Sequence, residues 1–248
     1  MVQAGSTAVL LGTVSPTGPD LAFPRTANAV IGGGVAVVVA LPILPLNPVR
    51  VVHRAAGPTL DLFAHQMTVA SEVLTRGDAD RAEAVLRRLR AAEVERRQTT
   101  EIVAAAREMA MPSPWPWPWP WRALLRRYEH AAEHLELAFT NSRNMVRRMV
   151  SLLEAREPVP PDLPLAIEHF GQALRLLHRD FLAGGTPDIA RTRALEAAAE
   201  VQRARTAGLG CSGTIVVSQV CIVVSELLQA SGLPKGEADR MAGLHVRH

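Results

Sequence analysis

Aromatic side chains, lysine and cysteine are all scarce in this chain of 248 residues. Phe, Trp and Tyr make up 4% of it, which argues against an all-β sandwich, because strands favour aromatic and β-branched residues. Lys235 is the single lysine, so the basic charge is almost entirely arginine. Cys211 and Cys221, if they share a helix, lie about 15 Å apart, too far for a disulfide. A reduced, cytoplasmic setting follows for that region.

The chain also lacks a strong charge of either sign. Its formal net charge is +3, weak and dispersed, whereas a nucleic-acid partner calls for a basic stripe on one face. No basic segment precedes the apolar N-terminus, so a signal peptide is not expected. Ala, Leu, Arg and Glu dominate after residue 50, a composition typical of long helices. The sequence therefore predicts an all-α protein without a nucleic-acid partner.

An uncharged run covers residues 26–46 and is long enough to cross about 30 Å of hydrocarbon. Small residues at Gly32, Ala36 and Ala40 line one face of such a helix, where another helix can approach closely. A buried strand of a soluble core is the alternative, but it needs only four to eight residues. The triple glycine lacks the Gly-Lys-Ser/Thr of a phosphate loop. We predict one transmembrane helix over 26–46, with Asn28 as a polar contact to a neighbouring helix.

Prolines and arginines mark the end of this segment. Pro42, Pro45 and Pro48 each disfavour a helix. Such breaks in a helix are tolerated at the membrane surface, where water reaches the backbone. The basic residues that follow, among them Arg50 and Arg54, indicate that the rest of the chain lies in the cytoplasm.

Residues 1–14 are also apolar but about half a span long, so the chain begins as though inside a partial transmembrane helix. We expect either that Met1 is a late start or that the membrane part is incomplete. Together these features predict a membrane segment over 1–47. Its expected partners are the lipid bilayer and other transmembrane helices, from a homo-oligomer or a missing membrane domain.

Helical periodicity predicts a cytoplasmic domain of long helices over 48–232. Helices are expected over 48–75 and over 78–111, with a turn at Gly77 and an N-cap at Asp78 between them. A heptad-like seam then predicts a helix ending near Glu157. The seam consists of Tyr128, Ala132, Leu135, Phe139, Ser142, Val146, Met149 and Leu153.

The C-terminal third predicts three further helices, over 163–181, 189–207 and 209–232. The last contains an uncharged run that ends at Glu226 and also permits a membrane interpretation; we favour a helix buried in the bundle. Residues 233–248 are expected to be a disordered tail.

A Trp-Pro repeat over 112–121 holds every tryptophan of the chain. Alternating prolines favour polyproline II over helix. One interpretation is an exposed low-complexity linker. The other interpretation is contact with lipid headgroups, because tryptophan prefers the headgroup layer of the membrane. The two preceding helices, one leaving the membrane and one returning, would bring the repeat back to that layer.

The strongest catalytic pattern is "HAAEH", His130 to His134, which matches the H-x-x-E-H signature of a zinc hydrolase. His130 is expected to face solvent, away from the seam, and the short motif arises readily by chance in such helices. Glu154 and Glu157 are interpreted as solvated helix charge. We therefore predict no enzyme, no catalytic or metal-binding residues and no cofactor.

The order of the parts resembles a known family. The segments that carry the resemblance are "VQAGSTAVLL", then "NAVIGGGVAVVVALPILPLNPVRVVHRA", then a long-helix domain ending in "VVSQVCIVVSELLQASGL". This layout is similar to the C-terminal portion of an actinobacterial FUSC family member, a group of fusaric-acid-resistance and aromatic-acid-exporter membrane proteins. Its most specific part is the exit "PLNPVR", Pro45 to Arg50.

The resemblance implies a plasma-membrane exporter of organic, and in particular aromatic carboxylic, acids, with its C-terminal domain in the cytoplasm. This chain departs from the family in lacking most of the membrane helices. The expected function is therefore the C-terminal part of such a transporter, truncated and inactive alone. The alternative is a membrane-anchored helical interaction or scaffold module without transport.

Overall fold

The computed structural model describes residues 48–93, 119–183 and 185–244, which form helices and no strands. The all-α class is therefore confirmed for these residues. They belong to one compact unit that begins at Pro48. The predicted partial helix 1–14, the predicted span 26–46 and the Trp-Pro residues 112–118 lie outside the described residues. The helices are α3 (Pro48–Arg76), a helix over 79–93, α5 (Trp119–Glu154), α6 (Asp162–Ala183), α7 (Asp188–Thr206), α8 (Cys211–Ala230) and α9 (Lys235–Met241).

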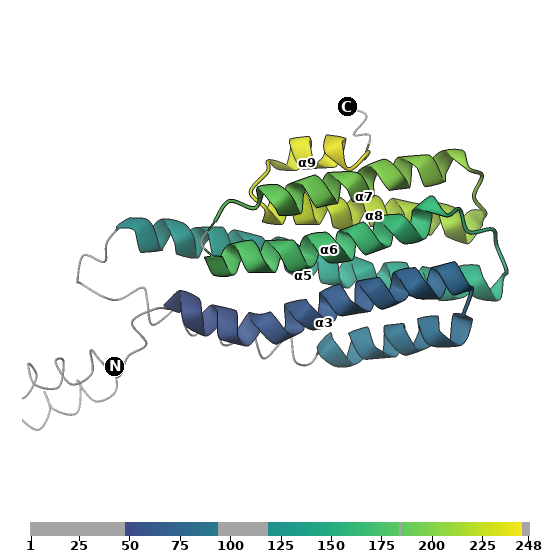
Figure 1. Ribbon diagram of the computed structural model, residues 1–248, viewed down its shortest axis with the longest axis horizontal. Coiled ribbons are helices and arrows are strands. Elements are labelled where there is room, and N and C mark those ends of the chain that lie inside the picture. Colours follow the sequence, from purple (N-terminus) through teal and green to yellow (C-terminus); the bar gives the residue numbers. More distant parts are fainter. Residues whose placement is uncertain (1–47, 94–118, 184, 245–248) are drawn as a thin grey trace, which may run out of the picture. The chain divides into compact units, whose positions relative to one another are not determined.

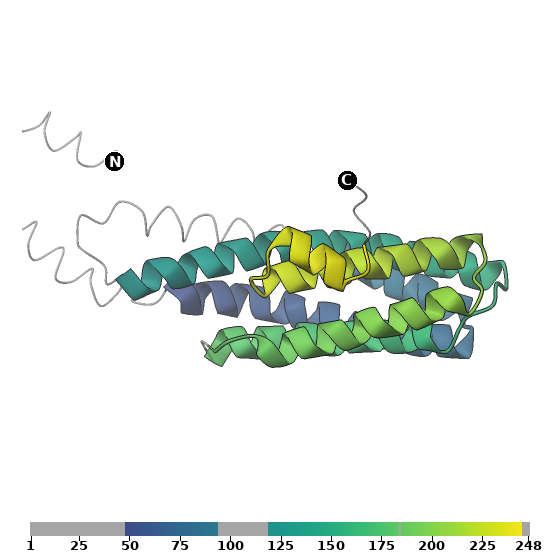
Figure 2. The same ribbon diagram turned by 90° about the horizontal axis from the view of Figure 1, so that it is seen from above.

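The long helices run side by side as a bundle, as the labels α3, α5, α6, α7 and α8 show in Figure 1 and the turned view in Figure 2. Each of α6, α7 and α8 packs against the helix next to it in the chain, and α5 packs chiefly against α8. Helix α3 packs against α6 and more lightly against α5, which closes the ring. The short α9 packs against α8.

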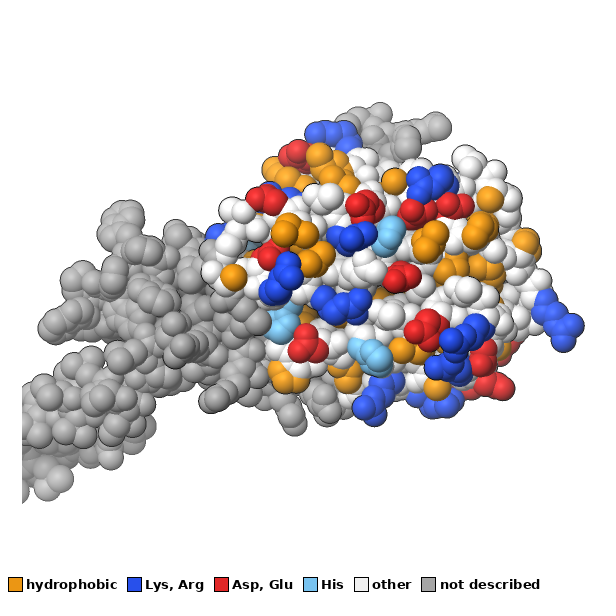
Figure 3. Space-filling view, in the orientation of Figure 1, with side chains coloured by type: hydrophobic (Ala, Val, Ile, Leu, Met, Phe, Trp, Pro, Cys, Tyr) orange, Lys and Arg blue, Asp and Glu red, His pale blue; other side chains and the backbone are white. Residues whose placement is uncertain are grey.

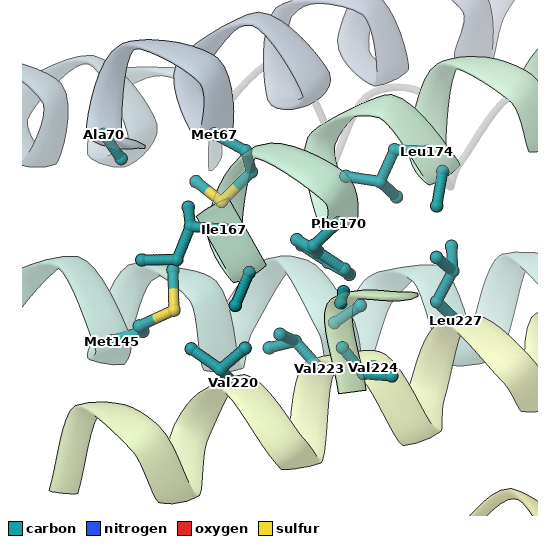
Figure 4. Close-up of a cluster of buried hydrophobic side chains, with 14 of the residues drawn as sticks. Met67, Ala70, Met145, Ile167, Phe170, Leu174, Val220, Val223, Val224 and Leu227 are labelled. Atoms are coloured by element: carbon teal, nitrogen blue, oxygen red, sulfur yellow. The ribbon is translucent and has the colours of Figure 1, made fainter. Parts of the chain in front are cut away.

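Apolar residues at helical spacing face the centre of this ring. Phe63 on α3 makes edge-to-face contacts with Phe139 of α5 and Phe170 of α6, with ring centroids 5.1 Å and 5.9 Å apart. Methionines and branched side chains fill the space between α3, α5, α6 and α8 (Figure 4). Burying each large apolar side chain contributes roughly 1.5–3 kcal/mol, so these helices depend on one another for stability.

The turn after α3 forms as the sequence predicts. Gly77 adopts a positive φ of 71°, which glycine accepts without strain. Asp78 caps the next helix, because its Oδ1 accepts the Arg81 backbone N–H at 2.9 Å. Val85 and Leu89 of that helix are buried. The predicted continuation over 94–111 lies outside the described residues.

The predicted seam of α5 is only partly correct. Phe139, Val146 and Met149 are buried, but Ala132 is exposed and Ala131 takes its place inside. Helix α5 contacts both α8 and α3, so its buried stripe is broader than a two-helix seam. A straight helix also drifts by about 20° per heptad from a strict seven-residue repeat.

Two predicted boundaries are wrong. Helix α5 begins at Trp119, inside the predicted linker 112–121, and Pro120 is accommodated because the first turn of a helix does not use its backbone N–H. The predicted disordered tail instead contains α9. Ala238 and Asp239 of α9 are buried, so packing against α8 orders a segment whose own apolar pattern is weak.

Helix α8 lies within the bundle, as predicted. Among the described residues it is the helix long and apolar enough to cross a membrane by length and composition alone. Gly232, with a φ of 98°, follows shortly after its end. Both cysteines lie on α8 and are free thiols. Cys211 is exposed at the start of the helix, and Cys221 is fully buried.

Candidate functional site

The H-x-x-E-H residues lie on α5, facing two directions. His130 and Glu133 are exposed, as expected for His130. His134 is half-buried, and its Nδ1 lies 2.7 Å from Oε2 of Glu226 on α8. The rings of His130 and His134 touch edge to face, with centroids 4.6 Å apart. Within the described part of the chain, no three His, Cys, Asp or Glu side chains are grouped so that they could hold a metal ion.

The pairing of His134 with Glu226 was not predicted. Their side chains are only 14% and 13% exposed, so this polar contact joins α5 to α8 in a largely dry environment. Glu226 is the one charge at the end of a long apolar run. A buried carboxylate needs a hydrogen-bond or ion-pair partner. The position of Glu226 at the end of an apolar run is therefore the sequence feature that indicates a partner for it.

The environment of Glu157 also differs from the solvated helix charge that the sequence predicts. The chain leaves α5 at Glu154, and Arg156 takes a positive φ of 50° before Glu157. The Glu157 carboxylate then accepts the backbone N–H groups of Ser212 at 3.1 Å and Gly213 at 3.0 Å. These hydrogen bonds lower the pKa of Glu157 below its usual 4.5. Glu157 therefore caps the N-terminus of α8, whose N-cap residue is glycine.

A second buried polar cluster joins α8 to α9. Ser225 donates its hydroxyl to Asp239 Oδ1 at 2.6 Å, and Gln229 Nε2 lies 3.2 Å from the Ser225 hydroxyl oxygen. Lys235 Nζ approaches the other Asp239 oxygen at 3.4 Å. Each member has a partner, so this cluster stabilises the position of α9 rather than presenting a reactive group.

A hollow of about 330 Å³ opens between α6 and α7. We call it the arginine hollow, after the residues that line it: Gln172, Arg175, Leu176, Arg179 and Arg193. The four α6 residues recur at helical spacing and so share one face. Basic side chains lie over α6 and α7 on the face of the bundle in Figure 3, with acidic side chains between them. The sequence does not single out any of these residues, because arginine recurs in every described helix except α8.

A scan of the chain against models of known protein families finds no match, and searches of curated proteins and of solved structures find no similar protein.

Proposed function

We propose that this chain is the C-terminal part of a plasma-membrane transporter that exports organic acids, and that it is not an enzyme. The observation that carries the proposal is the uncharged run over 26–46, long enough to span a bilayer, directly followed by a bundle of long helices that begins at Pro48. The resemblance to the FUSC family supplies the class of transported molecule.

The proposed topology has the bundle in the cytoplasm. Arg50, His53 and Arg54 follow the span closely, and basic residues near the end of a span favour the cytoplasmic side. One transmembrane helix cannot enclose a pathway for an acid. The proposed transporter therefore includes other transmembrane helices, from further copies of the chain or from a separate membrane domain.

The span is tested by extraction and by labelling. After membranes are washed with alkaline carbonate, we expect the full chain to stay in the membrane pellet. In a Cys211→Ser background, Val38→Cys should resist a water-soluble maleimide in inside-out vesicles, whereas Arg148→Cys, on an exposed part of α5, should react. Release by carbonate, or rapid labelling at position 38, would remove the basis of the proposal.

Export is tested in the organism that makes the chain, where any companion helices are present. Deleting the gene should increase the retention of preloaded benzoate. The full chain should restore export, and a version without residues 26–46 should not. Equal retention with and without the gene would overturn the transport function.

The second candidate is a membrane-anchored interaction module. Large apolar side chains on three helices favour it: Leu137 and Leu165 are 44% exposed, and Ile189 is 58% exposed. Exposed apolar positions of this kind can contact another protein. Retention in membranes without any effect on benzoate export would select this candidate.

A further inference from the structure

His130 and His134 lie one turn apart on α5, close enough to bind the same ion. Their ring centroids are 4.6 Å apart. Imidazole nitrogens bind Zn²⁺ at about 2.1 Å, so two rings that share one ion have centroids roughly 4.5–5.2 Å apart. Because His130 is exposed, rotation of its ring is enough to direct a nitrogen toward an ion that His134 binds. The spacing of the two histidines therefore suits a chelate.

Glu226 fixes the orientation of the second histidine. Its Oε2 lies 2.7 Å from His134 Nδ1. An ionised carboxylate only accepts hydrogen bonds, so Nδ1 carries the proton and, in the neutral ring, Nε2 presents its lone pair. Histidines that bind metal ions characteristically donate their other N–H to a carboxylate in this way. His134 keeps 14% of its side chain exposed, so its environment restrains the ring without sealing it from solvent.

The charges around the pair favour a cation. Glu133 is exposed, and helical spacing places it on the same side of α5 as the two histidines. Arg127, one turn before His130, donates a guanidinium N–H to the Gly185 carbonyl oxygen at 3.5 Å and so extends toward the loop between α6 and α7. The described residues offer no group of three ligands that could hold a metal ion. Water molecules therefore complete the coordination of an ion held by two imidazoles.

We propose that His130 and His134 chelate one Zn²⁺ ion, and that Glu226 is a positioning residue for His134. Imidazole ligands suit zinc and its neighbours among the transition metals, whereas Mg²⁺ and Ca²⁺ prefer oxygen. With two protein ligands, the dissociation constant is expected to be on the order of 10 μM. The proposal departs from the expectation that the chain has no metal-binding residues, and it assigns no hydrolase activity. It does not rest on the transport function, because zinc binding requires no membrane passage.

The test uses the full chain, purified in detergent without a histidine tag and titrated with zinc chloride by calorimetry. His245→Ala and His248→Ala are introduced throughout as a background, to remove the other closely spaced histidines of the chain. One Zn²⁺ per chain should bind. His130→Ala and His134→Ala should each weaken binding at least tenfold, because a chelate becomes a single ligand. His65→Ala, which removes an exposed histidine of α3, is the matched control and should bind like the background chain.

Glu226→Gln separates positioning from ligation. The neutral amide no longer compels His134 Nδ1 to carry the proton, so the zinc affinity should fall about tenfold while the stoichiometry stays at one. In the background chain labelled with ¹⁵N-histidine, NMR should show zinc on Nε2 of His134. Zinc on Nδ1, or an unchanged affinity in Glu226→Gln, would overturn the positioning role.

Three results would overturn the site itself. They are no zinc binding by the background chain, equal binding by the His130, His134 and His65 variants, or Mg²⁺ binding as tightly as Zn²⁺. Circular dichroism of each variant checks the fold. His130 is exposed, so His130→Ala stays decisive even if His134→Ala, which leaves Glu226 without this partner, misfolds. The carbonate and export experiments report separately on the proposed function, because neither measures zinc binding.

Discussion

At the residue scale, Glu157 shows how one side chain can connect distant segments. It lies just after α5 yet supplies the cap of α8, 55 and 56 residues further along the chain. Gly210 allows this contact, because a Cβ there would collide with the Glu157 carboxylate. Loop carboxylates are routinely taken for solvated charge, and nothing near Glu157 in the sequence names Ser212 or Gly213 as its partners. This part of the structure could not be predicted without the fold.

Replacing Glu157 by Gln should lower stability in a pH-dependent way. The folded-state pKa lies below the usual 4.5, so the ionised carboxylate stabilises the fold above that pH and loses its effect as pH falls through the lowered pKa. Glu157→Gln should therefore unfold at a lower temperature than the unmodified chain at pH 7, and the difference should shrink as the pH is lowered below 4.5. Thermal unfolding at pH 7 and at a series of acidic pH values measures this. Glu154→Gln, an exposed carboxylate one turn earlier, is the control; an equal loss in both variants would contradict the capping role.

At Gly171 helices α3 and α6 approach each other closely. A Cβ at this position would lie 3.0 Å from Met67 Cβ and 3.2 Å from the Ala64 carbonyl oxygen. A larger side chain must push the two helices apart, and overpacking of this kind costs about 1–3 kcal/mol. We expect Gly171→Val to lower the free energy of unfolding by that amount. Denaturant titration measures it.

Gly236 provides the matched control for this substitution. It lies in α9 with open space around its Cα, and alanine is the better helix former. Gly236→Ala should therefore be neutral or slightly stabilising. Full stability of Gly171→Val would show that the α3–α6 contact is looser than described.

At the element scale, periodicity describes the interior face of α6 well, although this helix packs against both α7 and α3. The apolar residues that recur there at steps of three and four are all buried: Leu163, Ile167, Phe170, Leu174, Leu177 and Phe181. The pattern was less informative for α5, where Ala131 replaces Ala132 inside, and for α9, which has one short turn of buried residues. The way in which helices lie against each other decides which individual residues meet. The pair of His134 and Glu226 is one example, and the arginines of the arginine hollow are another. Periodicity within one helix does not contain that information.

The two thiols of α8 give a direct measure of how this helix is packed. Cys211 is exposed, whereas burial of Cys221 raises the pKa of its thiol and keeps reagents away. A water-soluble maleimide should modify Cys211 within minutes and leave Cys221 unmodified until denaturant is added. Mass spectrometry counts the adducts. Cys211→Ser should show none in the folded state, and prompt labelling of that variant would mean that α8 is not enclosed by its neighbours.

At the scale of the whole molecule, the ring of helices is assembled from contacts between remote parts of the chain. His134 and Glu226, which join α5 to α8, are 92 residues apart. At about 5–20 residues per second of synthesis, α5 leaves the ribosome roughly 5–20 seconds before its main partner exists. During that interval Phe139, Met145 and Met149 have no α8 to cover them. The bundle is therefore completed late. Until the last third of the chain is translated, an apolar stripe of the nascent chain has no partner helix to cover it.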